Sequence, residues 1–280
     1  MNLFKQFSNL FRSGLKFGQY YKHLNEALRR YNDEYTMLHY PYFKNESDSL
    51  LQGQKNLTDY CISLLKPLKD KDVLEVGCGN GTQCHYINET CNPLNITGVD
   101  LDPTNIKIAN AEKERRQLKN SNFYLGDAQT LTMINDKSVD VIFNIESALH
   151  YPDKEAFLRQ INRVLKPGGQ FVITDILTKK GKGIGIRKIW KKSMKINNWQ
   201  KWQYDKGLAS ANLKVEHTED ITKDVIRAFK NWPDWFKQMK KQNFLNDSLF
   251  KFYYRIYLAW TLYLLRRRRE YYVFAGIKPE

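Results

Sequence analysis

The sequence lacks the cysteine and histidine patterns that mark a structural metal site. Its four cysteines are Cys61, Cys78, Cys84 and Cys91. No two of them have C-x-x-C spacing, and no histidine lies where it would complete a zinc pattern. We therefore expect reduced thiols in a cytoplasmic protein, and no metal ion.

Long hydrophobic runs are also missing. The longest candidate, residues 256–265, lies between Arg255 and Arg266, whereas a membrane-spanning helix needs about 20 apolar residues. The first 16 residues mix basic and aromatic side chains, without the compact apolar stretch and small-residue cleavage site of a signal peptide. Neither a membrane-spanning helix nor a secretory signal is expected.

Positive charge and aromatic side chains are what the chain has in excess. Its 280 residues carry a formal charge of +15, and 14% of them are aromatic, including 17 tyrosines. A basic surface attracts nucleic acid, anionic membranes or acidic substrates, and charge alone does not choose among them. Tyrosine combines apolar area with a polar group, which suits the wall of a ligand cavity.

Short apolar runs alternate with helical stretches from about Asp72 onward. The expected strands cover 73–76, 96–100, 123–125, 139–144, 170–177, 213–215 and 271–277. One helix is expected after Asp102–Pro103, because Asp caps a helix and Pro fits its first position. Another is expected to begin near Asp153. Strands that alternate with helices predict an α/β fold with a parallel sheet of βαβ units.

The remaining regions suggest four segments. They are a helical, aromatic lid (1–50), a cofactor-binding core (51–177), a basic insert with substrate-side helices and the sixth strand (178–265), and the final strand (266–280). Within 178–206, ten lysines and arginines stand against one acid, Asp205, and three tryptophans lie among them. This composition predicts an insert that contacts an anionic membrane surface.

A glycine-rich turn follows the first expected strand. Residues 75–81 read EVGCGNG and open a helix, which is where a nucleotide-type cofactor loop must lie. Glycines allow close backbone approach, and the amides at the start of a helix attract an anion. The acid two residues before the first glycine can accept a hydrogen bond from an ammonium group. S-adenosylmethionine carries an ammonium and a carboxylate, and no phosphate.

Two further acids follow the next two strands. Asp100 ends the second strand, 23 residues after Gly77, close to the spacing at which dinucleotide folds place a ribose-binding acid. Asp127 follows the third strand and could accept a hydrogen bond from an adenine amino group. Either acid alone could be a helix cap or a turn residue. The glycine-rich turn, Asp100 and Asp127 nevertheless follow three successive strands in the order that a cofactor site requires.

Together these motifs resemble those of class I S-adenosylmethionine-dependent methyltransferases. The resemblance rests on residues 75–81, GVD at 98–100, GDA at 126–128 and RVLKPGG at 163–169. Residues 144–153, NIESALHYPD, are similar to the branch that acts on sterols, tocopherols, quinone precursors, polyketides and phenolic lipids. The resemblance implies a Rossmann-like, mostly parallel sheet of seven strands with helices on both faces, an N-terminal helical lid and a lid insertion. The implied cofactor contacts are Glu75, Gly77, Cys78, Gly79, Gly81, Asp100, Leu101, Asp127, Ala128 and Asn144.

Three residues are candidates for the chemistry. His150 follows the fourth strand, at the sheet edge that faces ligands, and a histidine there can take a proton from an acceptor hydroxyl. Asp175, in the fifth strand, is expected to orient His150 or to bind the acceptor. Glu146 is the next candidate base.

The acceptor is expected to be a small apolar or aromatic molecule, methylated on oxygen or carbon. Its cavity is predicted to be roofed by Tyr35, His39, Tyr40, Tyr42 and Phe43, with help from 222–265. Deletion of residues 1–45 is expected to abolish turnover and to spare cofactor binding. The alternatives are a nucleic-acid methyltransferase, and a membrane-docking protein with a vestigial cofactor site. Against the first alternative, this chain has no Pro-Pro-aromatic motif after the fourth strand, where residues 144–147 read NIES.

Overall fold

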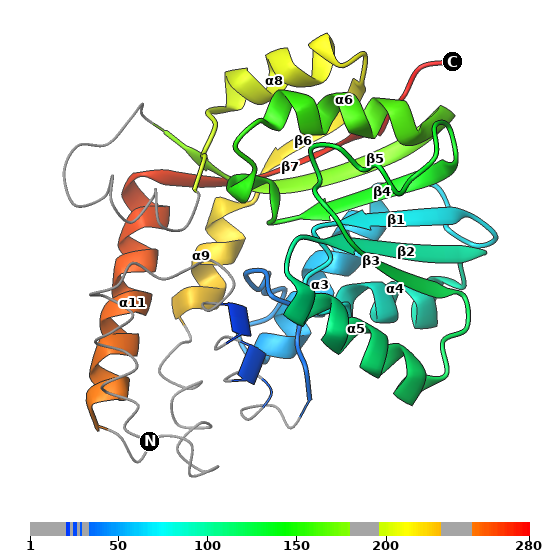
Figure 1. Cartoon of the computed structure of the whole chain (residues 1–280). Coiled ribbons are helices and arrows are strands. Elements are labelled where there is room, and N and C mark those ends of the chain that lie inside the picture. The colour runs from blue at the N-terminus through cyan, green and yellow to red at the C-terminus, as the bar shows by residue number, and fades with distance from the viewer. Residues whose placement is uncertain (1–20, 23–24, 27–28, 30–33, 180–195, 231–247) are drawn as a thin grey trace.

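A single sheet of seven strands organises the protein. The computed structural model describes residues 21–22, 25–26, 29, 34–179, 196–230 and 248–280. The strands are β1 (Asp72–Val76), β2 (Asn95–Asp100), β3 (Ser121–Leu125), β4 (Val139–Ile145), β5 (Leu165–Thr178), β6 (Lys214–Asp220) and β7 (Arg269–Ile277). Their order across the sheet is β3-β2-β1-β4-β5-β7-β6 (Figure 1). All seven strands expected from the sequence are confirmed.

The sheet is parallel except at one end. β1 pairs in parallel with β2 and β4, β2 with β3, and β4 with β5. β7 lies antiparallel between β5 and β6. Because β1 and β4 are neighbours that lead to opposite halves of the sheet, their carboxyl ends form a switch point, where open α/β sheets bind ligands.

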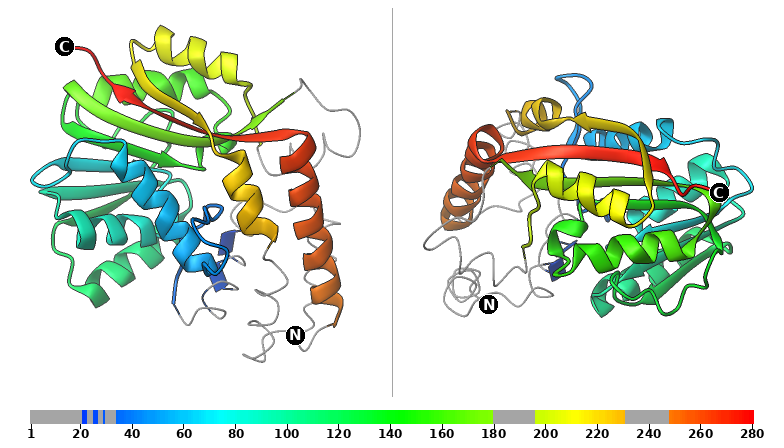
Figure 2. Two further views of the ribbon diagram at one scale, coloured as in Figure 1. Left: turned by 180° about the vertical axis from the view of Figure 1, so that it is seen from behind. Right: turned by 90° about the horizontal axis from the view of Figure 1, so that it is seen from above.

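Helices cover both faces of this sheet (Figure 2). They are α3 (Leu50–Ser63), α4 (Thr82–Cys91), α5 (Pro103–Arg116), α6 (Lys154–Val164), α8 (Lys201–Ser210), α9 (Thr222–Lys230) and α11 (Ser248–Arg267), with a 3₁₀ turn, η1 (Ala148–His150). α3, α4 and α5 lie on one face and α6 and α8 on the other, while α9 and α11 lie beside the start of β7. The expected Rossmann-like architecture is therefore confirmed.

Local sequence explains where the helices begin. Asp102 caps α5 by accepting a hydrogen bond from the Thr104 amide, and Pro103 occupies the first helical position. Asp153 caps α6 in the same way through the Ala156 amide. These caps satisfy amides that have no partner inside the helix. Both helix starts expected from the sequence are confirmed.

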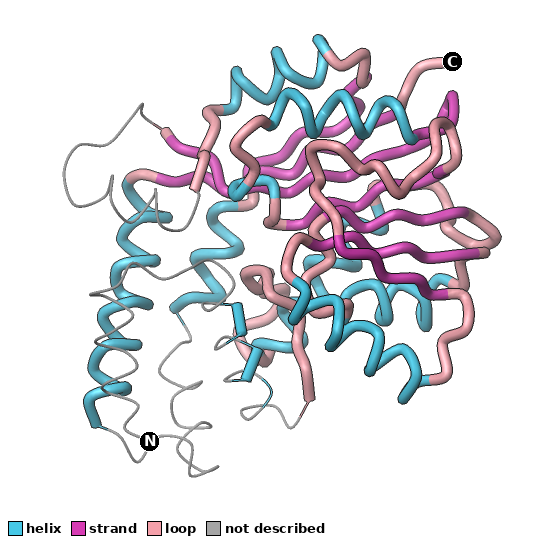
Figure 3. The backbone as a smooth tube through the Cα atoms, in the orientation of Figure 1, coloured by secondary structure: helices cyan, strands magenta, loops and turns pink. Residues whose placement is uncertain are grey.

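Some expectations need correction or lie outside the described residues. The sixth strand extends to Asp220, and the described parts of the stretch 222–265, which exclude 231–247, form the helices α9 and α11 (Figure 3). Most of the basic insert, including Trp190, lies outside the described residues. Trp199 is buried against Tyr204, with ring centroids 5.2 Å apart, so it is not a surface anchor. The four-segment division stays a prediction.

Candidate active site

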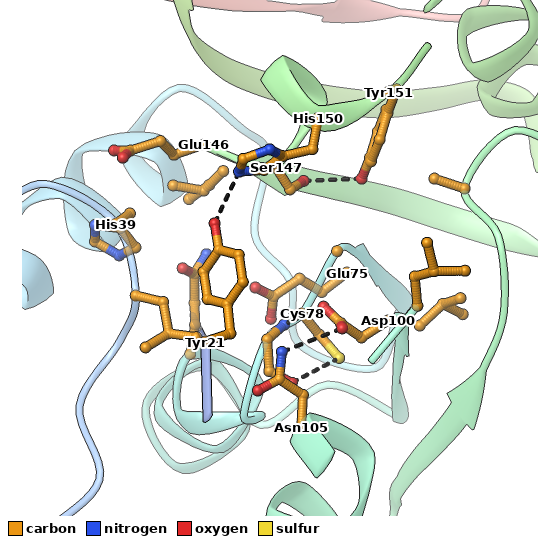
Figure 4. Close-up of a pocket in the computed structure, with 18 of the residues that line it drawn as sticks. Tyr21, His39, Glu75, Cys78, Asp100, Asn105, Glu146, Ser147, His150 and Tyr151 are labelled. Atoms are coloured by element: carbon orange, nitrogen blue, oxygen red, sulfur yellow. Dashed lines mark hydrogen bonds between the residues drawn. The ribbon is translucent and has the colours of Figure 1, made fainter. Parts of the chain in front are cut away.

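A cavity of about 250 Å³ lies at the carboxyl ends of the parallel strands. Its walls come from the loops after β1, β2, β3 and β4, and from the N-terminal segment that crosses above them (Figure 4). Eleven of the predicted cofactor, catalytic or substrate residues line it together: Glu75, Gly77, Cys78, Gly79, Asp100, Leu101, Asp127, Ala128, Glu146, His150 and His39.

The glycine loop takes its shape from left-handed backbone conformations. Gly77 has a φ of +74°, and a Cβ there would lie 2.3 Å from the Ser147 hydroxyl oxygen. Only glycine tolerates both conditions. Gly81 is the N-cap of α4, and its missing side chain lets α4 approach Ala109 of α5. Gly81 therefore shapes the loop without lining the cavity.

Glu75 presents a buried carboxyl at the base of the cavity. The Cys84 thiol donates a hydrogen bond to its Oε2 atom at 2.8 Å. Burial raises the pKa of Glu75 to about 8, although the hydrogen bond from Cys84 opposes that shift. A buried acid that faces a cavity is suited to a cationic group, because an ammonium ion would restore the charged form.

Asp100 is tied into the glycine loop. Its Oδ2 accepts from the Gly79 amide at 2.9 Å, and its Oδ1 accepts from the Asp102 amide at 2.9 Å and from Asn105 Nδ2 at 3.2 Å. Burial raises the pKa of Asp100, and these three hydrogen bonds oppose the shift. A carboxylate offers about four acceptor sites, so the Asp100 carboxylate can hold the loop and still accept from a bound hydroxyl.

The loop after β3 supplies a third acid. Asp127 lines the cavity, and its Oδ1 accepts hydrogen bonds from the backbone and side-chain nitrogens of Gln129 at 2.8 and 3.0 Å. The Gly126 amide donates to the Asp100 carbonyl at 3.0 Å. This bond fixes the loops after β2 and β3 to each other, so the two acids form one wall.

The tip of β4 carries the two candidate bases. His150 lies in η1, and its Nε2 is hydrogen-bonded to the Tyr21 hydroxyl at 2.8 Å. Glu146 has a φ of +51°, and its Oε2 accepts from the Tyr40 amide at 2.7 Å and from the Tyr271 hydroxyl at 2.8 Å. Burial raises the pKa of Glu146 to about 8, against the effect of these two donors.

Asn144 does not line the cavity, contrary to the prediction. It is fully buried, and its Nδ2 donates to the Val76 carbonyl at 2.8 Å and to the Ser147 hydroxyl at 2.6 Å. Tyr151 lies within the same hydrogen-bonded group, 3.1 Å from Asn144 Nδ2. Asn144 thus holds the turn after β4 against the end of β1, and it supports the site from behind.

Asp175 does not line the cavity, contrary to the prediction. Its carboxylate forms a fully buried ion pair with the Lys154 ammonium and accepts from the Tyr204 hydroxyl at 2.5 Å. Neighbouring residues of a strand point to opposite faces of a sheet. Thr174 therefore reaches the Glu146 amide, while Asp175 faces α6 and α8, away from the cavity.

The roof also differs from the prediction. Of the five residues expected there, only His39 lines the cavity, and burial lowers its pKa to about 4. Phe43 is fully buried in the core. The roof instead comes from Tyr21, Met37, Leu38 and His39.

The other three predicted roof residues make contacts elsewhere. Tyr35 lies beside Arg29, with 3.4 Å between the hydroxyl and a guanidinium nitrogen. Tyr42 stacks on Tyr60, with ring centroids 5.6 Å apart. Tyr40 packs edge-on against Phe229 and contributes its backbone amide to Glu146. Met37 and Leu38 carry no chemical signature, so sequence reasoning could not single them out.

The donors and acceptors of the cavity fit S-adenosylmethionine. Glu75 could accept from its ammonium group, and Asp100 and Asp127 could accept from the ribose hydroxyls and the adenine amino group. A Cβ at Gly79 would lie 3.0 Å from the Leu38 side chain, so glycine at this position leaves room for Leu38 next to the loop. Within the described parts of the chain, no cluster of three or more metal-ligating side chains occurs.

Cofactor binding is expected to release a proton from Glu75. With a pKa of about 8, this carboxyl is mostly protonated at pH 7, and an adjacent ammonium favours its ionised form. The affinity for S-adenosylhomocysteine should therefore rise as the pH increases from about 6 to 8, and then level off. Calorimetry in buffers of different ionisation enthalpy measures the released proton.

Two variants isolate the contribution of Glu75 to this pH dependence. Glu75→Gln should bind S-adenosylhomocysteine with an affinity that changes little between about pH 6 and 8, because glutamine has no proton to release. Glu89→Gln is the control, since Glu89 lies on the outer face of α4 and pairs with Arg116. An identical pH dependence in wild type and Glu75→Gln would contradict the assignment.

The chain is similar to known methyltransferases over much of its length. A family model described as a methyltransferase domain matches residues 67–243. A phthiotriol/phenolphthiotriol dimycocerosates methyltransferase of Mycobacterium tuberculosis is 40% identical over 164 residues, which are 59% of this chain and 52% of that protein. A fatty-acid O-methyltransferase of Mycolicibacterium smegmatis is 33% identical over 162 residues, 55% of this chain and 57% of that protein. The chain thus spans about half the length of these relatives.

Solved structures show the same fold. A geranyl diphosphate C-methyltransferase from Streptomyces coelicolor superposes with a TM-score of 0.74 at 14% identity, covering 94% of this chain and 96% of that one. The [4+2]-cyclase SpnF superposes with a TM-score of 0.75 at 20% identity, covering 94% and 95%. At these identities the likeness concerns architecture alone.

Proposed function

The chain belongs to the methyltransferase-domain family, and from this membership we propose that it transfers the methyl group of S-adenosylmethionine to a small, apolar or aromatic acceptor, leaving S-adenosylhomocysteine. The observation that carries the proposal is a shared cavity. His150 and Glu146, which follow β4, line the same space as Glu75 and Asp100. Candidate bases and candidate cofactor ligands therefore face one another across a single site.

The proposed roles of the residues follow from what the transfer requires. S-adenosylmethionine supplies a methyl group that its sulfonium already activates. The protein has to align the acceptor, exclude water and accept a proton. Met37, Leu38 and Ile145 offer apolar contact to the acceptor. Tyr21 lines the cavity beside His150, to which its hydroxyl is hydrogen-bonded.

His150 is the proposed general base for a hydroxyl acceptor. Its Nε2 faces the cavity and is hydrogen-bonded to Tyr21. An acceptor hydroxyl can lose its proton to Nε2 directly after displacing Tyr21. It can also pass the proton through the Tyr21 hydroxyl, which gives its own proton to Nε2. Glu146 is the second candidate base, held in place by Tyr40 and Tyr271.

The acidic lining of the cavity favours a neutral acceptor. Glu75, Asp100, Asp127 and Glu146 all line it, and among the residues that the structure describes no lysine or arginine does. A carboxylate acceptor would therefore meet several acids and no basic side chain among these lining residues. An acceptor hydroxyl or activated carbon has to lose a proton to a base, whereas an amine needs only to arrive neutral. The candidate bases His150 and Glu146 therefore support O- or C-methylation.

Contact with an anionic membrane is a further part of the proposal. Trp260 and Tyr263 stack on the exposed side of α11, just before Arg266 and Arg267. Trp202 is also exposed, but it lies on α8, away from α11 (Figure 1). Aromatic and basic side chains at one surface suit an anionic interface. In the described part of the chain, no helix is both long enough and apolar enough to cross a membrane. A lipid-like acceptor could then be taken from the membrane surface.

Transfer of a labelled methyl group tests the proposal. The full chain is incubated with methyl-labelled S-adenosylmethionine and, separately, with a phenolic lipid, a long-chain alcohol, a fatty acid, a lipid amine and RNA. Label is expected on the phenolic or alcoholic lipid, and more of it when the lipid is presented in anionic vesicles at low salt. Label on RNA alone, or on the amine alone, would contradict the proposed acceptor class. Equal turnover in anionic and neutral vesicles would contradict the membrane contact.

A further inference from the structure

A chain of side-chain amides joins the N-terminal segment to the acid after β2. Asn80, in the glycine loop, donates to Asn25 Oδ1 at 2.8 Å. Asn25 in turn donates from Nδ2 to Asn105 Oδ1, also at 2.8 Å. Asn105, in the first turn of α5, donates to Asp100 Oδ1 at 3.2 Å (Figure 4).

These amides are almost completely removed from water. Asn25 and Asn80 are each 2% exposed, and Asn105 is 3% exposed. A buried amide that loses its partner costs more free energy than the bond itself contributed, because water cannot replace the partner. Removing the side chain of Asn25 would take away one of the two acceptors of Asn80 Nδ2 and the donor to Asn105 Oδ1.

The same segment is fixed to the glycine loop at two further points. Asn80 Nδ2 also donates to the Thr36 carbonyl at 2.9 Å. Leu38 lies directly above Gly79, close to the space that a Cβ there would fill. Asn25, Thr36 and Leu38 all precede the region that matches the family model, which begins at residue 67.

We infer that Asn25 is a cofactor-positioning residue. By holding Asn105 and Asn80 at once, it fixes the Asp100 carboxylate and the glycine loop in the relative position that binds S-adenosylmethionine. The inference rests on the proposed cofactor, and it does not depend on the acceptor. It also reverses the expectation that deletion of residues 1–45 would spare cofactor binding: such a deletion should weaken it.

A consequence is that the acceptor pocket forms together with the cofactor site. Met37, Leu38 and His39 line the roof, and they belong to the segment that Asn25 and Thr36 connect to the glycine loop. Cofactor bound at Asp100 therefore stabilises the roof, and the roof slows the release of the cofactor.

Calorimetric binding of S-adenosylhomocysteine, without any acceptor, tests the inference. Asn25→Leu keeps the approximate size of the side chain, is compatible with a helical backbone and removes both of its hydrogen bonds. We expect its dissociation constant to rise about tenfold, the scale of two lost hydrogen bonds. Lys22→Ala is the matched control, since Lys22 is an exposed neighbour, and its dissociation constant should stay within twofold of wild type.

The same substitution in an Asp100→Ala background separates positioning from a general loss of structure. If Asn25 acts through Asp100, the two losses are not additive, and Asn25→Leu should weaken binding less than about threefold there. A full tenfold loss in both backgrounds, or an unchanged constant in the single variant, would overturn the inference.

Hydrogen exchange on the wild-type protein keeps the inference testable if Asn25→Leu does not fold. S-adenosylhomocysteine should slow the exchange of amides in residues 34–40, because the roof and the cofactor stabilise each other. Exchange in this segment that is unchanged on saturation with S-adenosylhomocysteine would overturn the inference. If the methyl-transfer assay fails while the calorimetry and hydrogen exchange give the expected results, only the proposed acceptor class is contradicted.

Discussion

Replacement of His150 by alanine is expected to lower kcat about 10²- to 10⁴-fold on a hydroxyl acceptor, which is the range for loss of a positioned general base. His150 is the histidine that follows β4, and its Nε2 lies within hydrogen-bond distance of Tyr21 at the cavity. The affinity for S-adenosylhomocysteine should change little, because the proposed cofactor contacts are Glu75, the glycine loop, Asp100 and Asp127 and do not include His150. Steady-state kinetics and calorimetry on the same preparation measure both effects.

The pH dependence of His150→Ala distinguishes lost proton transfer from lost packing. Activity should recover in part as the pH rises, because the acceptor then ionises without help. His217→Ala is the control: His217 lies in β6, is partly exposed and contacts Tyr60 and Glu219. If His150→Ala has only a small effect that does not vary with pH, Glu146→Gln becomes the variant to examine.

The second large effect is expected at the buried ion pair between Lys154 and Asp175. Burial lowers the pKa of Lys154, and the carboxylate of Asp175 opposes that shift. Lys154→Met should reduce the free energy of unfolding by about 3–5 kcal/mol, because it leaves a carboxylate buried without its cation. Urea titration measures this loss, and the melting temperature should fall by about 10 °C.

A double variant tests the physical reason. Lys154→Met combined with Asp175→Leu removes both charges, so it should recover much of the lost stability. Cofactor affinity should be near wild type in every variant that remains folded at the assay temperature. If Asp175→Asn abolishes turnover but leaves the urea midpoint unchanged, Asp175 has a catalytic role after all.

The sequence predicted the sheet and the cofactor loop better than it predicted the substrate side. The strands and the acids that follow them have periodic or spaced signals, and Glu75, Asp100 and Asp127 all line one cavity. Asp175 was misassigned because β5 is buried on both faces from Phe171 to Leu177. A strand of this kind shows no alternation of polar and apolar residues that would indicate which face each side chain takes.

The roof was harder to predict for a different reason. Residues 34–49 have no regular secondary structure, so no periodicity indicates which side chains point inward. Tyrosine density was a poor guide, because Tyr42 packs on Tyr60, away from the cavity. The contacts of Tyr21 and Asn25 join residues that are 129 and 80 positions apart, and single-sequence reasoning has no signal for pairs at such separations.

The position of β7 in the sheet has a consequence for how the protein is made. In the described sheet, β6 is an edge strand whose neighbour is β7, and β7 separates β6 from β5. On the ribosome, β6 therefore emerges about 50 residues before its partner, with its backbone polar groups unpaired and its edge open to other chains. The Tyr271 hydroxyl that holds Glu146 arrives with β7 as well. A nascent chain that is released early would thus lack part of its candidate active site and would also be prone to aggregate.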